Sequence, residues 1–141
     1  MVPITWISKN VAISPAFEMD EINHIKKMGI DAIVDLRSED QDDADLMRQA
    51  KMEFFHIEVD DRYAPTQNQF DEIFDFVNPL LNQDKKILIH CQNGYQRSPL
   101  LAITILIKRG MNVTDAKKLL KHRHPTSSFT PPQEEFIEKL K

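Results

Sequence analysis

Short apolar runs alternate with amphipathic stretches along almost the whole chain, and this pattern predicts an α/β fold. The apolar runs typical of strands are residues 5–7, 11–13, 32–36, 53–57 and 86–90. The stretches that predict helices are residues 17–27, 42–51, 70–81, 99–109, 113–121 and 132–140. In the third of these, apolar side chains recur at helical spacing, and Pro79 is expected to bend or shorten the helix.

Strands that alternate with helices assemble into a largely parallel or mixed sheet with helices on both faces. No repeat or low-complexity linker interrupts the alternation, so we expect a single domain over residues 1–141. Ligands of such sheets bind beyond the carboxyl ends of the strands. The segment after residue 90 lies at such an end, and it is therefore the first candidate for a functional site.

That segment, His90 to Ser98, contains the only cysteine of the chain, six residues before an arginine. It joins a predicted strand to a predicted helix. It therefore lies at a helix N-terminus, where free N–H groups and the helix dipole favour an anion. The same setting favours the thiolate form of a cysteine. Cys91 and Arg97 thus predict a thiolate nucleophile inside a phosphate-binding loop.

The neighbouring residues suit this interpretation. Gly94 permits a positive φ, so that successive loop amides can point inward as an anion-binding nest. The planar guanidinium of Arg97 matches two phosphoryl oxygens. Ser98 can cap the helix or donate to the sulfur, and His90 is expected to order the loop from behind rather than act as a general base. The expected phosphate-binding residues are Gln92, Asn93, Gly94, Tyr95, Gln96 and Arg97.

Two simpler interpretations of Cys91 compete with this one. A lone cysteine after an apolar strand is most often a buried small hydrophobic residue. The spacing of His90, Gly94, Arg97 and Ser98 around Cys91 favours the nucleophile instead. His90 and Cys91 also suggest a metal site, yet no second Cys or His pair at ligand spacing accompanies them. We therefore expect neither a metal nor an organic cofactor.

The segment from His90 to Ser98 resembles the signature of the cysteine-dependent protein tyrosine phosphatases: His-Cys, five variable residues, Arg, then Ser or Thr. The short chain is similar to the dual-specificity group and to compact microbial phosphatases, and the resemblance extends from about Thr5 to Leu140. It implies a protein tyrosine phosphatase-like fold, with a central sheet of four to five mostly parallel strands and helices on both faces.

The resemblance also implies a general acid in the loop after the strand that contains Ile57 and Val59. Asp61, thirty residues before the cysteine, takes that position, and Asp60 is the alternative. A proton donor is needed because the departing alkoxide or phenoxide is otherwise a poor leaving group. The catalytic residues implied are Cys91, Arg97, Asp61 and Ser98, with His90 in support.

A second segment, residues 129–133, departs from the larger tyrosine-specific relatives. Their water-positioning loop resembles Gln-Thr-x-x-Gln, whereas Phe129 replaces the first glutamine here. Dual-specificity members also commonly lack that glutamine. Gln133 either contributes to water positioning or is a solvent-exposed residue in the first turn of a helix.

The main functional hypothesis is a protein phosphatase that acts on phosphotyrosine, and also on phosphoserine or phosphothreonine, through a cysteinyl-phosphate. A phosphatase of a non-protein ester, such as a phosphoinositide or an RNA 5′ end, is a second hypothesis. It is weakened because the variable loop positions Gln92, Asn93, Tyr95 and Gln96 are all uncharged. A phosphate-binding module without turnover is the third. Tyr63, Tyr95 and Phe129 are candidate residues for the rim of the site.

Composition adds few constraints on function. The net charge of −4 gives no general attraction to nucleic acid or to anionic membranes, and no apolar run is long enough to span a bilayer. A single cysteine and the lack of a signal-peptide pattern suggest a reducing compartment, so we expect a cytoplasmic protein. Its expected partners are phosphorylated proteins, and a monomer is favoured. The acidic cluster between Glu39 and Asp45 is interpreted as the solvated start of a helix.

Overall fold

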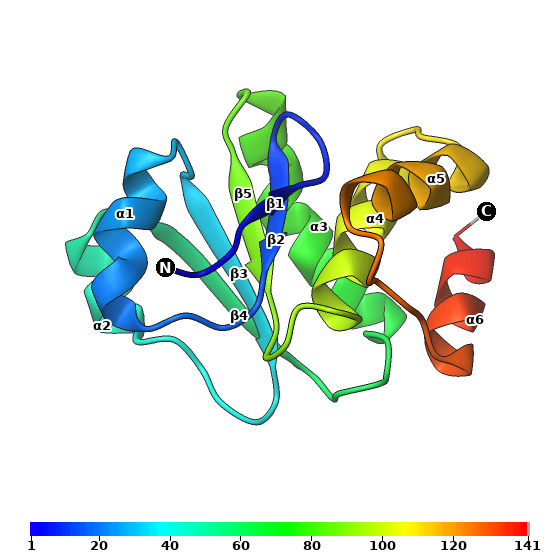
Figure 1. The fold of residues 1–141 in the computed structure, drawn as a ribbon, viewed down its shortest axis with the longest axis horizontal. Coiled ribbons are helices and arrows are strands. Elements are labelled where there is room, and N and C mark those ends of the chain that lie inside the picture. Colours follow the sequence, from blue (N-terminus) through cyan, green and yellow to red (C-terminus); the bar gives the residue numbers. More distant parts are fainter. Residues whose placement is uncertain (141) are drawn as a thin grey trace.

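A five-stranded sheet forms the centre of the computed structural model, which describes residues 1–140 (Figure 1). The strands are β1 (Thr5–Trp6), β2 (Val11–Ser14), β3 (Ala32–Arg37), β4 (Glu53–Val59) and β5 (Ile87–His90). Their order across the sheet is β1-β2-β5-β3-β4, and only the β1–β2 pair is antiparallel. The predicted α/β class and the number of strands are confirmed.

Helices cover both faces of this sheet (Figure 1). They are the 3-10 turn η1 (Met19–Glu21), α1 (Ile22–Lys27), α2 (Ala44–Gln49), α3 (Gln67–Asn82), α4 (Arg97–Lys108), α5 (Val113–Arg123) and α6 (Pro131–Lys139). Helices α1 and α2 lie on one side, and α3 to α6 lie on the other. The alternation within β5 explains this division, since Ile87 and Ile89 face the α3–α6 side while Leu88 faces the α1–α2 side.

Helix α4 is the most deeply buried helix, and its N-terminus follows directly from the loop after β5. All of its residues from Arg97 to Ile105 are buried, as is Ile107. The predicted helix began at residue 99. The structure begins it at Arg97, so the first turn includes both Arg97 and Ser98. This placement holds the start of α4 rigidly against the carboxyl ends of the strands.

Several predicted boundaries differ from the structure. The predicted helix at 17–27 begins later, because Glu18 is extended and the ring of Phe17 packs against that of His90 at 4.8 Å. The predicted helix at 42–51 begins at Ala44, with Asp43 as its N-cap, because the carboxylate of Asp42 is used elsewhere. Helix α3 is not shortened at Pro79, and it continues to Asn82.

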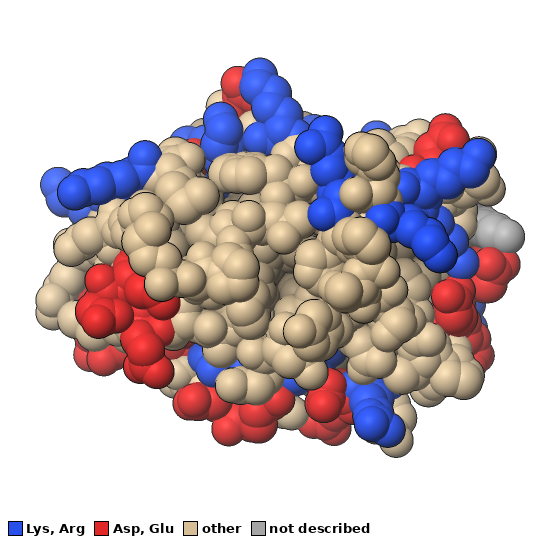
Figure 2. Space-filling view, in the orientation of Figure 1, with Lys and Arg blue, Asp and Glu red and all other residues tan. Residues whose placement is uncertain are grey.

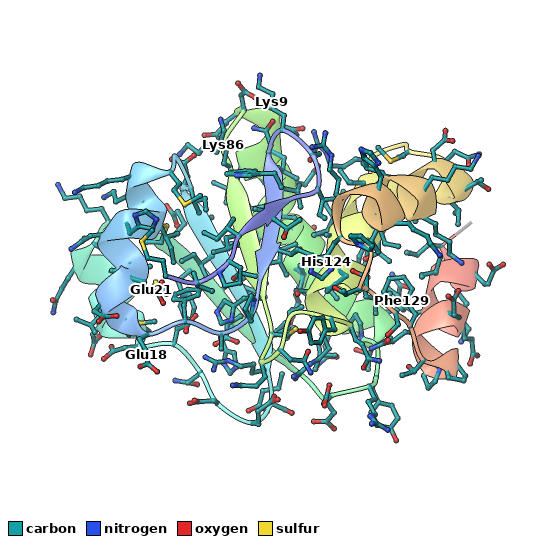
Figure 3. The ribbon with its side chains drawn as sticks, in the orientation of Figure 1. Lys9, Glu18, Glu21, Lys86, His124 and Phe129 are labelled. Carbon is teal, nitrogen blue, oxygen red and sulfur yellow. The ribbon has the colours of Figure 1, made fainter. Side chains whose placement is uncertain are left out.

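The charged side chains are unevenly distributed over the surface (Figure 2). Asp and Glu gather mainly along the edge at which β3, β4 and β5 end, and Lys and Arg gather along the opposite edge and over α5. Lys9 and Lys86 mark that opposite edge (Figure 3). Among residues 1–140, no helix is both long and apolar enough to cross a membrane.

Candidate active site

The loop from Cys91 to Gln96 connects the end of β5 to the first turn of α4. Gly94 has a φ of +83° at its centre, and a Cβ atom there would lie 3.0 Å from the backbone nitrogen of Pro15. Both conditions require glycine. The loop is also held from the β2 side, because the Ala16 N–H donates to the Gln92 carbonyl at 3.0 Å.

The sulfur of Cys91 lies at the floor of this loop, with no exposed surface. The Gly94 N–H donates to Sγ at 3.3 Å, and Ser98 Oγ lies 3.4 Å from Sγ. These contacts at a helix N-terminus stabilise negative charge on sulfur. The interpretation of Cys91 as a mere hydrophobic residue does not account for them. Within the same loop, the backbone N–H of Tyr95 donates to Asn93 Oδ1 at 3.1 Å.

Arg97 is buried beside the loop, and three of its five N–H donors are engaged. Nη1 and Nη2 each donate to one carboxylate oxygen of Glu39 at 2.7 Å, and Nη1 also donates to the Val59 carbonyl at 2.9 Å. Nε makes no hydrogen bond within residues 1–140, although Asp61 Oδ1 lies 3.7 Å away. The two remaining donors, Nε–H and the second N–H of Nη2, form a fork that matches two phosphoryl oxygens.

The Glu39 carboxylate and the Arg97 guanidinium perturb each other. The hydrogen bond from Arg97 lowers the pKa of Glu39 from 4.5 to about 2. Burial lowers the pKa of Arg97, but the hydrogen bond to Glu39 and the charges of Cys91, Glu39 and Asp61 outweigh it, so the pKa of Arg97 is raised overall. Arg97 therefore stays charged, and Glu39 fixes the direction of its free fork.

Glu39→Gln is expected to change how stability depends on pH. The pKa of Glu39 is lowered on folding. Its contribution to the free energy of unfolding is therefore fully present above pH 4.5 and is lost as the pH falls through about 2. The variant should unfold at a lower urea concentration than the wild type at neutral pH. The gap between the two midpoints should then shrink below pH 4.5. Urea titrations monitored by circular dichroism across this range measure the effect.

Glu134→Gln serves as the matched control for this experiment. Glu134 pairs with Lys117 at 2.8 Å, and both side chains are half-buried, whereas Arg97 is fully buried, so the Glu134 pair is expected to contribute less. The gap between this control and the wild type should stay small at every pH. A Glu39→Gln curve that runs parallel to the wild-type curve down to pH 2 would show that Glu39 does not stabilise the fold through its charge.

A buried charge network, formed by Asp35, Arg37, Asp42 and His90, supports the loop from behind. Arg37 bonds to Asp35 at 3.1 Å and to Asp42 at 3.2 Å. His90 Nε2 lies 2.5 Å from Asp42 Oδ2, and Nδ1 lies 3.4 Å from the Cys91 carbonyl oxygen. Arg37 Nη1 also donates to Gln92 Oε1 at 3.2 Å. His90 thus links the buried network to the backbone of Cys91.

The same cluster raises the question of a metal. Asp35, Asp42 and His90 bring possible ligand atoms within 4.8 Å of one another. However, the guanidinium of Arg37 already bonds to both carboxylates. A buried cation from the protein thus balances their charge, and the donor set does not suit a metal ion as well.

The predicted acid loop lies at the entrance to the site. Asp61 lines a hollow of about 320 Å³ together with the loop residues Asn93, Tyr95 and Gln96. The side chain of Asp61 is half exposed, and its carboxylate approaches Arg97 Nε. Asp60 does not line this hollow, and its carbonyl closes a turn by accepting from the Tyr63 N–H at 3.0 Å. The geometry thus favours Asp61 over Asp60.

The three candidate rim aromatics differ in their placement. Tyr95 and Tyr63 are 50% and 58% exposed, and only Tyr95 lines the hollow. Phe129 is half-buried and packs against the core on the α3–α6 side. Figure 3 shows it with His124 on the segment between α5 and α6, on the other side of the sheet from Glu18 and Glu21.

Sequence reasoning missed Glu39 and Asp42 and left the role of Gln133 open. The acidic cluster was interpreted as a solvated helix start, which is wrong for Glu39 and Asp42, since they bind Arg97 and His90. Their position just beyond the carboxyl end of β3 indicates that this segment lies near the site, but it does not single out these two carboxylates among their acidic neighbours. Gln133 is fully buried, so its interpretation as a solvent-exposed residue is also wrong.

Comparisons with known proteins agree with this geometry. Residues 15–141 match the family described as "Dual specificity phosphatase, catalytic domain". Protein-tyrosine-phosphatase IBR5 of Arabidopsis thaliana is 30% identical over 73 residues, which are 51% of this chain and 27% of that protein. Tyrosine-protein phosphatase vhp-1 of Caenorhabditis elegans is 35% identical over 77 residues, which are 53% of this chain and 12% of that protein. The matches thus span about a quarter or less of these relatives' own lengths.

Solved structures resemble the chain over nearly its full length. The crystal structure of Tk-PTP in the active form has a TM-score of 0.87 at 26% identity, and the match covers 97% of this chain and 95% of that one. The crystal structure of PTPMT1 has the same TM-score at 15% identity, covering 98% and 93%, and this likeness supports the fold alone. The chain belongs to the dual specificity phosphatase catalytic-domain family and is a cysteine-dependent phosphatase.

Proposed function

We propose that this phosphatase hydrolyses phosphotyrosine in proteins, with phosphoserine and phosphothreonine as further substrates, through a cysteinyl-phosphate intermediate. One observation carries the proposal: the sulfur of Cys91, the hydroxyl of Ser98 and the free fork of Arg97 converge at the N-terminus of α4. This arrangement provides a nucleophile, a partner for the returning thiolate and a cradle for the transferred group.

In the first step, the thiolate attacks phosphorus while Arg97 and the loop amides hold the phosphoryl oxygens. A bond forms between sulfur and phosphorus, and the bond between phosphorus and the ester oxygen breaks. The electron pair leaves with that oxygen, which takes the proton of Asp61. The products of this step are the dephosphorylated hydroxyl compound and cysteinyl-phosphate.

In the second step, water attacks phosphorus and displaces the sulfur. The carboxylate of Asp61 accepts a proton from the water, and inorganic phosphate is released. Ser98 Oγ, 3.4 Å from Sγ, stabilises the thiolate as it leaves. The cycle then ends with Cys91 and Asp61 in their starting forms.

The charges around the site support a protein substrate over a polyanionic lipid. The variable loop positions Gln92, Asn93, Tyr95 and Gln96 carry no cation. Glu39, Asp40 and Asp60 follow the carboxyl ends of β3 and β4, and among the described residues acidic side chains outnumber the single cation Arg62 that lines the hollow. Additional phosphates on an inositol ring would meet repulsion there. PTPMT1 has been crystallised in complex with PI(5)P, but at 14% identity it shares only the fold with this chain.

The exposed ring of Tyr95 supports phosphotyrosine as the preferred substrate. It stands at the rim of the 320 Å³ hollow, where the phenyl ring of a bound phosphotyrosine can pack against it. Phosphoserine offers no such surface. Aromatic contact therefore favours the phenolic ester, while the phosphate cradle serves either ester.

Trapping the intermediate tests the proposed function. Acid quenching within milliseconds of mixing with a phosphotyrosyl peptide should give a Cys91 peptide that carries one phosphoryl group, detected by mass spectrometry. Ser98→Ala should increase the trapped fraction, because the second step loses its stabilising hydroxyl. Ser8→Ala, in a hollow at another part of the surface, is the matched control and should leave that fraction unchanged.

A phosphoseryl peptide and a short-chain phosphatidylinositol phosphate are tested as further substrates in the same trapping experiment. We expect phosphoryl transfer from both peptides, with faster transfer from phosphotyrosine. Labelling by the phosphoinositide alone would contradict the proposed substrate class. Turnover of any substrate without label on Cys91, in both the wild type and Ser98→Ala, would contradict the covalent route.

A further inference from the structure

The turn that carries Asp61 buries none of its own side chains. The four residues from Asp60 to Tyr63 are all exposed. Arg62, the third of them, has a φ of +72°, a left-handed conformation that is unfavourable for a residue with a Cβ atom. The turn is closed by one backbone hydrogen bond, from the Tyr63 N–H to the Asp60 carbonyl. Its conformation therefore needs support from elsewhere.

Two side chains at the start of α6 provide that support, and we call them the α6 clamp (Thr130 and Gln133). Thr130 Oγ1 donates to the Arg62 carbonyl at 2.7 Å, and Gln133 Nε2 donates to the Tyr63 carbonyl at 3.2 Å. Gln133 Oε1 accepts from the Thr130 N–H at 3.0 Å, which joins the two members of the clamp. Gln133 is fully buried, so the clamp has a rigid base.

The other end of the turn is held by the phosphate-binding arginine. Arg97 Nη1 donates to the carbonyl of Val59, the last residue of β4. Hydrogen bonds thus hold the backbone at Val59, before Asp61, and at Arg62 and Tyr63, after it. From these contacts we infer that Thr130 and Gln133 are positioning residues, which hold the Asp61 carboxyl group where it can protonate the leaving oxygen. This inference rests on the proposed role of Asp61 as the general acid.

The contacts of Gln133 distinguish this role from direct water positioning. Its amide oxygen and its amide nitrogen both bond to backbone groups, of Thr130 and Tyr63. The side chain is therefore oriented toward the acid turn, 70 residues away in sequence. Loss of the clamp should impair proton donation and leave the nucleophile intact.

Thr130→Val tests the clamp, since it removes the donor hydroxyl and keeps the shape of the side chain. The readout is kcat/KM for phenyl phosphate, whose leaving group needs protonation, compared with 4-nitrophenyl phosphate, whose leaving group needs it less. We expect a fall of about 10- to 100-fold on phenyl phosphate and of about twofold or less on 4-nitrophenyl phosphate. Gln133→Leu should show the same selectivity.

Thr130→Ser and Thr104→Val are the matched controls. The serine variant keeps the hydroxyl, so the ratio of its kcat/KM values for the two substrates should equal that of the wild type. Thr104 Oγ1 donates to the Leu100 carbonyl at 2.8 Å within α4, so its valine variant loses a similar bond at another location. That variant should keep the wild-type ratio, whatever its stability. The rate at which iodoacetate alkylates Cys91 should be the same in all folded variants.

The outcomes separate the clamp from the proposed function. An equal fall on both substrates, or none, in Thr130→Val and Gln133→Leu would overturn the clamp. If Asp61→Asn shifts the ratio while the clamp variants do not, only the clamp fails. If Asp61→Asn itself leaves the ratio unchanged, the assignment of the acid fails, and the clamp fails with it.

Discussion

Cys91→Ser is expected to abolish hydrolysis of 4-nitrophenyl phosphate while the phosphate site stays intact. A serine hydroxyl is a far weaker nucleophile than a thiolate, and none of the described contacts supplies a base to activate it. We expect kcat to fall by at least about 10⁴-fold, the scale seen when a covalent nucleophile is removed. Steady-state assays at matched protein concentration measure the loss.

Binding of tungstate to Cys91→Ser tests whether the phosphate site stays intact. The fork of Arg97 and the loop amides do not depend on sulfur, so the oxyanion should still bind, as measured by isothermal titration calorimetry. Arg97→Lys is the contrasting variant, because lysine lacks the planar fork, and it should bind tungstate more weakly. Turnover by Cys91→Ser at the wild-type rate would contradict a covalent mechanism.

Asp61→Asn is expected to have the second largest effect, and the effect should depend on the leaving group. A positioned general acid contributes about 10²- to 10⁴-fold. We expect a fall in kcat/KM within that range for phenyl phosphate and a smaller fall for 4-nitrophenyl phosphate. Steady-state assays with the two esters measure this difference.

Asp60→Asn is the matched control, since it makes the same chemical change one residue away. The Asp60 carbonyl closes the turn, but its side chain does not line the hollow. This variant should retain most of its activity and the wild-type dependence on the leaving group. The reverse result, a crippled Asp60→Asn and an active Asp61→Asn, would exchange the roles of the two residues.

The sequence predicted the elements whose signals are local. Strand β5 was identified from its apolar residues, and α6 within one residue at each end, because periodicity and capping residues act within a few positions. The loop after β5 was found because its residue types occur together at fixed spacing. The late start of α1 was missed, because the packing of Phe17 against His90 is a contact between distant segments.

The electrostatic partners of the site could not be predicted for the same reason. Glu39 meets Arg97 across 58 residues, and Asp42 meets His90 across 48. No local pattern separates these two carboxylates from their acidic neighbours, and only the parallel order of β3 and β5 brings them to the loop. Gln133 was singled out as a candidate, but its amide nitrogen donates to the Tyr63 carbonyl, 70 residues away, and the sequence does not place that contact.

The uneven distribution of charge also affects how ions enter and leave the cleft. With acidic groups at one edge and basic groups at the other, the molecule has an electric dipole moment whose negative end carries the catalytic opening. A dianion diffusing inward is repelled until Arg97 draws it in, and the liberated phosphate is driven outward along the same gradient. Added salt, which shortens the Debye length, weakens both effects. The charge at this edge therefore opposes retention of inorganic phosphate, and the attraction comes from Arg97 at the centre of the site.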